Sequence, residues 1–384
     1  MSQLTRRTFL RGLSATVLGS LAFGTTSCEA PGTSGDGAAA IPLSIGYLPI
    51  ACATPLVLAD AAGIFARHGV NVQLKKYAGW ADLWSAYATG ELDVAHMLSP
   101  MALAIDAGVT HGSRPTELSF SLNTNGNAIV LANDLHPHTR QPSDLKGTVM
   151  AIPFEYSIHA MLLRDWLAAG GVDPVRDLEL RLLRPADMVA QLEVGGIDGF
   201  IVAEPFNQRA LQIGAGRIFT ATREHWDRHP CCSLAIAKQW RGEHPDRAEA
   251  LVAALDEASA FANDQGRHRE VVDILAQEKY LNQPASLISP VLAGKYLDWD
   301  GEQISDPDYM SFGDSTSFTA MTWMAAQIAR WDLSSASPLS LDDAAITAAA
   351  RSVLPAGVPV DGGPVMINGQ LFDPAHPTRN YARN

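Results

Sequence analysis

The chain repeats one order of short apolar runs and helical segments, and this repeat restricts the fold more than any other feature. Residues 43–100 alternate expected strands and helices, and residues 149–205 follow the same order. Each half carries a Gly-x-(Leu/Ile)-Asp segment, beginning at Gly90 and at Gly195, just before its last apolar run. Alternating strands and helices are typical of α/β folds with parallel sheets. The sequence therefore predicts an α/β protein with two similar lobes.

Capping residues help to place the expected elements. Thr54 followed by Pro55 suggests a helix N-cap with proline in the first turn, and Ser157 suggests a second N-cap. Gly90 suits the left-handed position that ends a helix. Strands are expected at residues 43–47, 70–74, 149–152 and 178–183, and helices at residues 81–88, 186–193, 245–265, 270–279 and 318–331.

Aligning the two halves indicates where a ligand would bind. Ser99-Pro100 falls opposite Glu204-Pro205, and both pairs follow an expected strand. Ligand sites of parallel α/β sheets lie outside the carboxyl ends of the strands. Two lobes that face each other with these ends would form a cleft, and a hinge would let them close over a small molecule.

The N-terminus has the features of an export signal. Thr5-Arg6-Arg7-Thr8-Phe9-Leu10-Arg11 resembles the twin-arginine consensus, and the apolar stretch 13–23 is shorter than the roughly 20 residues that span a bilayer. Residues 1–27 are therefore expected to be a signal peptide. Thr25-Thr26-Ser27-Cys28 resembles a lipoprotein processing site, which predicts lipid attachment at Cys28. The alternative is a soluble periplasmic protein cut a few residues later.

Composition and missing motifs exclude several classes of protein. Of the 384 residues, 41 are Asp or Glu and 28 are Lys or Arg, so the net charge of −13 disfavours nucleic acid as a partner. Four cysteines are too few for a disulfide scaffold in a chain of this length. The sequence has no P-loop, no dinucleotide-binding Gly-x-Gly-x-x-Gly after a strand and no Gly-x-Ser-x-Gly elbow. We therefore expect neither an enzyme nor a bound cofactor.

Seven short segments together resemble one family of transport proteins. They are residues 46–50 (GYLPI), 79–83 (GWADL), 95–101 (AHMLSPM), 125–129 (NGNAI), 166–174 (WLAAGGVDP), 203–206 (AEPF) and 323–331 (WMAAQIARW). Their order is similar to that of the periplasmic nitrate- and bicarbonate-binding proteins of ABC importers, within the wider nitrate/sulfonate/taurine type. The resemblance implies a type II periplasmic binding protein fold, with two hinged α/β lobes and the ligand cleft between them.

The pattern along the chain predicts the domain boundaries, and the resemblance implies the partners. Residues 28–40 have no periodicity and are expected to be a flexible tether. Residues 41–124 and 233–384 would form the first lobe, because the later helices would pack back on it, and residues 125–232 would form the second lobe. The chain would be a monomer that captures a small solute such as nitrate, bicarbonate, a sulfonate or a small organic molecule. It would deliver that solute to the transmembrane subunits of an ABC permease, in the periplasm or at the outer face of the cytoplasmic membrane.

The same resemblance implies the residues of the cleft. The loop from Cys52 to Thr54, Trp80, Asn127 and His159 match positions that line it in the nitrate and bicarbonate binders. Asn127 stands where those proteins have Gln, and Cys232 stands where they have a lysine that serves the anion. Losing that charge-assisted hydrogen bond costs on the order of 1.5–3 kcal/mol, which counts against nitrate. Replacing Trp80 or His159 with alanine is expected to weaken binding and to leave thermal stability nearly unchanged.

Other residues allow more than one interpretation. Ser99 and Glu204 lie at the expected cleft, where Glu204 would accept hydrogen bonds from a ligand or from backbone N–H groups. His96 follows a buried run and is expected to be a core histidine. Cys231 and Cys232 would line the pocket, form a vicinal disulfide, or bind a soft metal together with His225 and His229.

Two alternative functions therefore stay open beside the solute-binding one. The cysteine pair would suit a pyrimidine-precursor (thiamine-related) binding protein or enzyme on the same fold. It would also suit a soft-metal binding protein that uses His229, Cys231 and Cys232.

Overall fold

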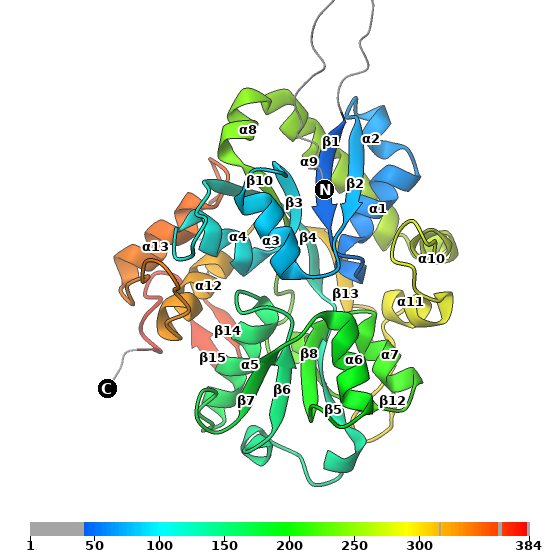
Figure 1. Cartoon of the computed structure of the whole chain (residues 1–384), viewed down its shortest axis with the longest axis vertical. Coiled ribbons are helices and arrows are strands. Elements are labelled where there is room, and N and C mark those ends of the chain that lie inside the picture. The colour runs from blue at the N-terminus through cyan, green and yellow to red at the C-terminus, as the bar shows by residue number, and fades with distance from the viewer. Residues whose placement is uncertain (1–41, 315, 360–362, 382–384) are drawn as a thin grey trace, which may run out of the picture. The chain divides into compact units, whose positions relative to one another are not determined.

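The computed structural model describes residues 42–314, 316–359 and 363–381 (Figure 1). The predicted signal peptide, the predicted tether and Cys28 lie outside the described residues. Among the residues that are described, no helix has the length and apolar character needed to cross a bilayer.

The first large sheet has six strands in the order β13-β4-β10-β3-β1-β2. Strand β1 pairs parallel with β2 and β3, whereas β10 pairs antiparallel with β3 and β4, and β13 antiparallel with β4. The strands are β1 (Leu43–Tyr47), β2 (Val72–Lys76), β3 (Val94–Leu98), β4 (Thr116–Asn125), β10 (Cys232–Ala237) and β13 (Met310–Asp314).

The second large sheet has five strands in the order β7-β6-β8-β5-β9. Strand β6 pairs parallel with β7 and β8, and β5 pairs antiparallel with β8 and β9. The strands are β5 (Asn127–Ala132), β6 (Val149–Ile152), β7 (Glu179–Leu182), β8 (Gly199–Ala203) and β9 (Gly216–Ala221). Two small antiparallel pairs complete the strands: β11 (Lys295–Leu297) with β12 (Gln303–Ser305), and β14 (Val365–Ile367) with β15 (Gln370–Phe372).

The two large sheets share one plan. In the first sheet, β1 lies between the parallel strands β2 and β3, and the antiparallel β10 follows β3. In the second sheet, β6 lies between the parallel strands β7 and β8, and the antiparallel β5 follows β8. The order β2-β1-β3-β10-β4 in one sheet corresponds to β7-β6-β8-β5-β9 in the other. The predicted α/β class and the predicted repeat of the two halves are therefore both confirmed.

Helices connect and cover the strands. Helix α9 packs on α1, β4 and β13, and α12 packs on α4 and α13, while α6 and α7 lie beside β8 (Figure 1). The helices are α1 (Thr54–Ala61), α2 (Ile64–Arg67), α3 (Trp80–Ala88), α4 (Ser99–Asp106), α5 (Ile158–Ala169), α6 (Pro185–Glu193), α7 (Phe206–Gln212), α8 (Lys238–Glu243), α9 (Pro245–Asn263), α10 (His268–Leu275), α11 (Ala285–Leu292), α12 (Phe318–Arg330) and α13 (Asp343–Ser352). Short 3-10 turns occur at Ala51–Ala53, Asn133–Leu135, Pro142–Leu145, Thr222–Glu224 and Gln265–Arg267.

Two crossings between the sheets run side by side. Strand β4 passes into β5 at Asn125 and Gly126, and the return to β10 runs through Pro230, which forms an isolated bridge with Thr124. Gly126 has a φ of +75°, and a Cβ there would lie 2.8 Å from the Met310 side chain. Only glycine meets both conditions without strain. The crossing therefore depends on the Asn-Gly-Asn sequence at this point.

The predicted lobe boundary assigns residues 285–305 to the first lobe, but parts of this segment contact elements of the second sheet and its cover. Helix α11 contacts α7, and β11 contacts β9, which are elements of the second sheet and its cover. Trp299 packs in the apolar cluster of the second sheet, and its indole N–H donates to the Thr139 carbonyl at 2.9 Å. We propose that residues 285–305 belong to the second lobe. The predicted boundary at residue 232 also changes, because Cys232 is the first residue of β10 in the first sheet. The other predicted boundaries stay a proposal.

The capping predictions have mixed outcomes. Thr54 is not an N-cap: a 3-10 turn at Ala51–Ala53 runs directly into α1, and the Thr54 hydroxyl donates to the Ala51 carbonyl at 2.7 Å. Ser157 does cap α5, because its Oγ accepts from the Ala160 N–H at 3.0 Å. Gly90 has the expected left-handed conformation after α3.

Replacing Ser157 with alanine should destabilise the folded protein by about 1 kcal/mol, since one backbone N–H at the start of α5 loses its acceptor. Chemical denaturation of the variant measures this loss. Ser157→Thr keeps a hydroxyl at the cap and should recover most of it. Equal losses in the two variants would contradict the capping role.

Candidate functional site

The candidate site is built where strands of both sheets end or begin. Cys52 follows β1, His159 lies in the first turn of α5 after β6, and Asn127 is the first residue of β5. Cys231 directly precedes β10, whose first residue is Cys232. Because β5 and β10 run antiparallel to their neighbours, their first residues share the edge at which the parallel strands end. These side chains meet at that edge, as the alternating pattern predicts.

Asn127 connects the two sheets at this point. Its Oδ1 lies 2.9 Å from His159 Nε2 and 3.5 Å from Cys231 Sγ, and its Nδ2 donates to the Asn125 carbonyl at 3.2 Å. An amide oxygen only accepts hydrogen bonds, so His159 donates from Nε2. His159 Nδ1 is buried and has no partner within the described structure. One imidazole nitrogen is therefore free to meet a ligand.

Three cysteine sulfurs gather beside Asn127. Cys231 Sγ lies 3.9 Å from Cys52 Sγ and 3.8 Å from Cys232 Sγ, and all three lie within 4.8 Å of one another. All three side chains are fully buried free thiols. A disulfide requires about 2.05 Å between sulfurs, so the structure does not contain the vicinal disulfide considered for Cys231 and Cys232.

The three thiols differ in their electrostatics. Burial raises the pKa of Cys52 and Cys232 well above the usual value, and their interactions with Cys231 raise it further. Burial also acts to raise the pKa of Cys231, but its interactions with Cys232, Cys52 and the nearby His159 outweigh burial, so that this pKa lies well below the usual range. Of the three sulfurs, Cys231 is therefore the one that loses its proton most readily.

His96 of β3 and Trp80 at the start of α3 pack against each other. Their ring centroids are 5.5 Å apart, and Trp80 is only 3% exposed. The Leu48 N–H donates to His96 Nδ1 at 3.4 Å, which leaves the ring proton on Nε2. That Nε2 is buried without a partner in the described structure, and burial lowers the pKa of His96 to about 4. His96 is thus a neutral imidazole with an unused N–H.

Ser99, Thr54 and Glu204 use their polar atoms within the protein. Ser99 Oγ lies 2.7 Å from Ser233 Oγ and 3.2 Å from the Cys231 carbonyl, which helps to fix the position of Cys231. One Glu204 oxygen accepts from the Tyr309 hydroxyl at 2.5 Å and the other from the Gln208 N–H at 3.2 Å. These three predicted binding residues support the site, and their polar groups have protein partners.

The predicted metal set of His225, His229, Cys231 and Cys232 is wrong as a set. In the part of the chain that the structure describes, the only group of three or more candidate ligands with closely spaced donor atoms is Cys52, Cys231 and Cys232. His229 Nε2 lies 2.8 Å from the Thr222 hydroxyl, which itself donates to the Asn127 carbonyl. His225 packs against Trp166, with 5.5 Å between the ring centroids. Neither histidine offers a nitrogen to the sulfurs.

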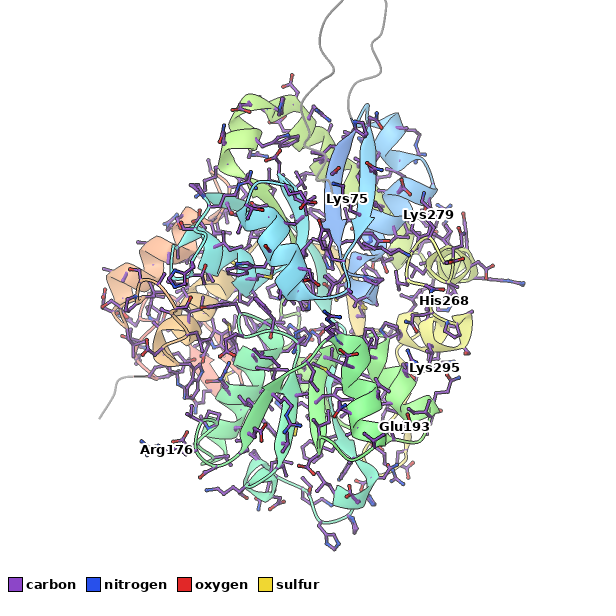
Figure 2. All side chains as sticks on the ribbon, viewed as in Figure 1. Lys75, Arg176, Glu193, His268, Lys279 and Lys295 are labelled. Atoms are coloured by element: carbon purple, nitrogen blue, oxygen red, sulfur yellow. The ribbon has the colours of Figure 1, made fainter. Side chains whose placement is uncertain are left out.

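The site lacks a lysine or arginine. Among the described residues, Arg164 is the only buried residue of either type, and it pairs with Glu155. Lys75 and Lys279 lie on the outside, where they face Glu91 and Asp60, and Lys295 is also exposed (Figure 2). Cys232 stands where the nitrate and bicarbonate binders have a lysine. Within the described structure, no other buried lysine or arginine supplies that positive charge at the site.

One contributor is not predicted as a site residue. His96 is expected to be a core residue, and its unused N–H is evident only once Leu48 is placed beside it. No local pattern indicates this role, because the contact joins residues 48 positions apart in the chain. Arg184, at the start of α6, is exposed and covers Gly79, where a Cβ would be 3.4 Å from the arginine side chain.

Comparisons with known proteins agree with this architecture. The profile of the NMT1-like family matches residues 36–276. The bicarbonate transport ATP-binding protein CmpC of Synechocystis is 34% identical over 76% of this chain, which spans 46% of CmpC. The chain thus spans about half the length of the first curated relatives that it matches. The nitrate/nitrite binding protein NrtA of Synechococcus elongatus is 31% identical over 86% of this chain and 84% of NrtA.

Solved structures confirm the predicted type II periplasmic binding protein fold. The periplasmic nitrate-binding protein NrtA from Synechocystis superposes with a TM-score of 0.80 at 25% identity, over 88% of this chain and 96% of NrtA. The alkanesulfonate-binding protein SsuA from Xanthomonas axonopodis reaches a TM-score of 0.61 at 18% identity, over 76% of this chain and 91% of SsuA. The predicted resemblance is confirmed: this chain belongs to the NMT1-like family and is homologous to the NrtA nitrate-binding proteins.

Proposed function

We propose that this chain is the solute-binding component of an ABC importer of the nitrate/sulfonate/taurine type. It captures a small solute between its two sheets and delivers it to the permease subunits, and it is not an enzyme. Export by the twin-arginine route and attachment to the membrane through Cys28 belong to the same proposal, which places the protein in the periplasm or at the outer face of the cytoplasmic membrane.

One observation supports this function most directly. Side chains from both sheets meet at one buried point, where Asn127 of β5 contacts His159 of α5 and Cys231 beside β10. Two imidazole nitrogens, His159 Nδ1 beside Asn127 and His96 Nε2 in β3, are buried without partners in the described structure. Buried polar groups are normally hydrogen-bonded, so these two nitrogens favour a ligand that supplies the missing partner.

The proposed mechanism is a shift between open and closed arrangements. His159 and Asn127 belong to the second sheet, whereas Cys52, Cys231 and His96 belong to the first. A solute that contacts both groups is bound completely only when the sheets approach each other, and so it favours the closed state. Closure would then form the surface that the permease recognises.

A thermal-shift panel tests this function. Nitrate, bicarbonate, an alkanesulfonate, a neutral heterocycle and soft metal ions would each be added to the purified protein. At least one is expected to raise the unfolding temperature, because a ligand at 100 times its Kd adds about 2.7 kcal/mol of stability. His159→Ala should weaken that ligand at least tenfold, since a buried hydrogen bond or ligand bond is lost.

His68→Ala is the matched control for the panel. His68 follows α2 and pairs with Glu257 at the surface, so its loss should leave the ligand affinity unchanged. If no compound class shifts the unfolding temperature, or if both histidine variants behave alike, the proposed site is wrong.

A further inference from the structure

The cysteine cluster has the geometry of a metal site. Its two closest sulfur–sulfur distances are 3.8 and 3.9 Å. With a metal–sulfur bond of about 2.3 Å, three sulfurs around one ion stand about 4.0 Å apart in a trigonal site and about 3.8 Å apart in a tetrahedral one. The side chains would need little movement to surround one ion.

The ligand chemistry restricts which ion the cluster would hold. No Asp or Glu belongs to the group of closely spaced ligand atoms in the described part of the chain, so the oxygen ligands that Mg²⁺ and Ca²⁺ need are missing. Thiolates select soft ions, above all Cu(I) and Zn(II). Zn(II) prefers four ligands, whereas three sulfurs satisfy a trigonal ion such as Cu(I).

The surroundings also disfavour an anion at this point. Cys232 occupies a position beside the sheet crossing, and no buried lysine or arginine faces the cluster within the described structure. His159, whose Nδ1 has no partner in the described structure, shares the Asn127 amide oxygen with Cys231, at 2.9 Å from Nε2 and 3.5 Å from Sγ. A cation drawn to sulfur and nitrogen therefore matches the site better than a nitrate or bicarbonate ion does.

The three thiols belong to the first sheet and its loops, whereas the imidazole of His159 belongs to the second. Cys231 is held on the first sheet, because its carbonyl accepts from the Ser99 N–H and its own N–H donates to the Asn123 carbonyl. His159 is held on the second sheet by α5. An ion seated on the sulfurs is thus placed where the approach of the second sheet adds a nitrogen-bearing side chain, as expected for a transported solute.

We propose that Cys52, Cys231 and Cys232 bind one soft d10 metal ion, with Cu(I) preferred, and that this ion is the solute of the site. The inference rests on the proposed function, to which it adds the class of solute. Binding releases the protons of the neutral thiols and involves no change of oxidation state.

Metal titration of the full chain tests the inference. The protein, carrying Cys28→Ser so that only the three cluster thiols remain, is reduced without oxygen and stripped of metal by a chelator. Cu(I) or Zn(II) is then added against a competing chromophoric chelator, and bound metal is counted after gel filtration. The expected result is one Cu(I) per chain, a thiolate-to-metal charge-transfer band in the ultraviolet and a raised unfolding temperature.

Variants assign the ligands. Cys52→Ser, Cys231→Ser and Cys232→Ser should each weaken Cu(I) binding at least tenfold, whereas Ser259→Ala, a buried hydroxyl on α9 outside the cluster, should bind as the parent does. The charge-transfer band of the parent protein reports sulfur ligation even if a serine variant fails to fold. Metal binding without that band, or unchanged in the three variants, would overturn the proposal.

The same samples separate this inference from the proposed function. If neither metal binds but an anion or organic compound raises the unfolding temperature and requires His159, the metal inference fails and the solute-binding function stands. If neither metals nor any other compound binds, both fail. A loss of two titratable thiols under native, non-reducing conditions would show a disulfide and would also overturn the metal site.

Discussion

Replacing Trp323 with alanine is expected to destabilise the folded protein by about 3–5 kcal/mol, the cost of removing a large aromatic side chain from a packed core. Trp323 is fully buried in α12, and its ring lies 5.1 Å from that of Trp226 in an edge-to-face arrangement. Its indole N–H donates to the Tyr381 hydroxyl at 3.0 Å, which ties the end of the chain to α12. Urea denaturation followed by circular dichroism measures the loss.

Two comparisons divide this loss into its parts. Tyr381→Phe removes only the hydrogen bond and should cost about 1 kcal/mol. Trp331→Ala, at a half-buried tryptophan that follows the same helix, removes a ring of the same size and should cost clearly less than Trp323→Ala. If the two tryptophan variants lost equal stability, burial of Trp323 would not be the cause.

Much of the fold was predictable because its signals are local. The alternation of apolar runs with helical segments, and the glycines after helices, depend on residues close in sequence. The elements β1, β6, α3, α6 and α12 lie within about two residues of their expected bounds. Thr54 shows the limit of such signals. Thr-Pro suits a helix start, but the preceding 3-10 turn moves the start and leaves the hydroxyl with another partner.

The position of residues 285–305 could not be predicted in the same way. The Trp299 ring packs against the second sheet and donates to Thr139, a residue 160 positions away in the chain. The local sequence pattern of residues 285–305 does not indicate which of the two sheets they pack against, because both sheets have apolar surfaces to cover. Pairing over such distances depends on the assembled fold.

The sequence predicted those site residues that lie at the ends of neighbouring strands, because such ends meet at one edge of a sheet. The resemblance and the strand pattern brought Asn127, His159, Cys231 and Cys52 to one edge, where the structure places them together. The expectation that Trp80→Ala leaves stability unchanged needs revision, since Trp80 is 3% exposed and packs against His96. That variant should lose stability as well as affinity. The same holds for His159→Ala, because His159 is 1% exposed, so ligand affinity must be measured on the folded variants.

Folding stability should fall as the pH rises from about 4.5 to about 7, because of Glu204. Burial raises the pKa of this carboxyl from 4.5 to about 7, although hydrogen bonds from Tyr309, from the Gln208 N–H and from Asn207 oppose the shift. Between these two values the folded protein keeps a proton that the unfolded chain releases, so each step up in pH favours unfolding. The contribution amounts to about 3 kcal/mol and is complete above pH 7.

Glu204→Gln isolates this contribution, because glutamine resembles the protonated carboxyl and does not ionise. Denaturation of both proteins from pH 4 to pH 8 gives the difference in unfolding free energy, which should move by about 3 kcal/mol in favour of the variant as the pH rises. Glu193→Gln, at an exposed carboxyl that ends α6 (Figure 2), serves as the control and should show no such trend. A difference that stays constant for Glu204→Gln would mean that this carboxylate is stabilised in its charged form, and that its contacts with Tyr309 and Gln208 offset the cost of burial.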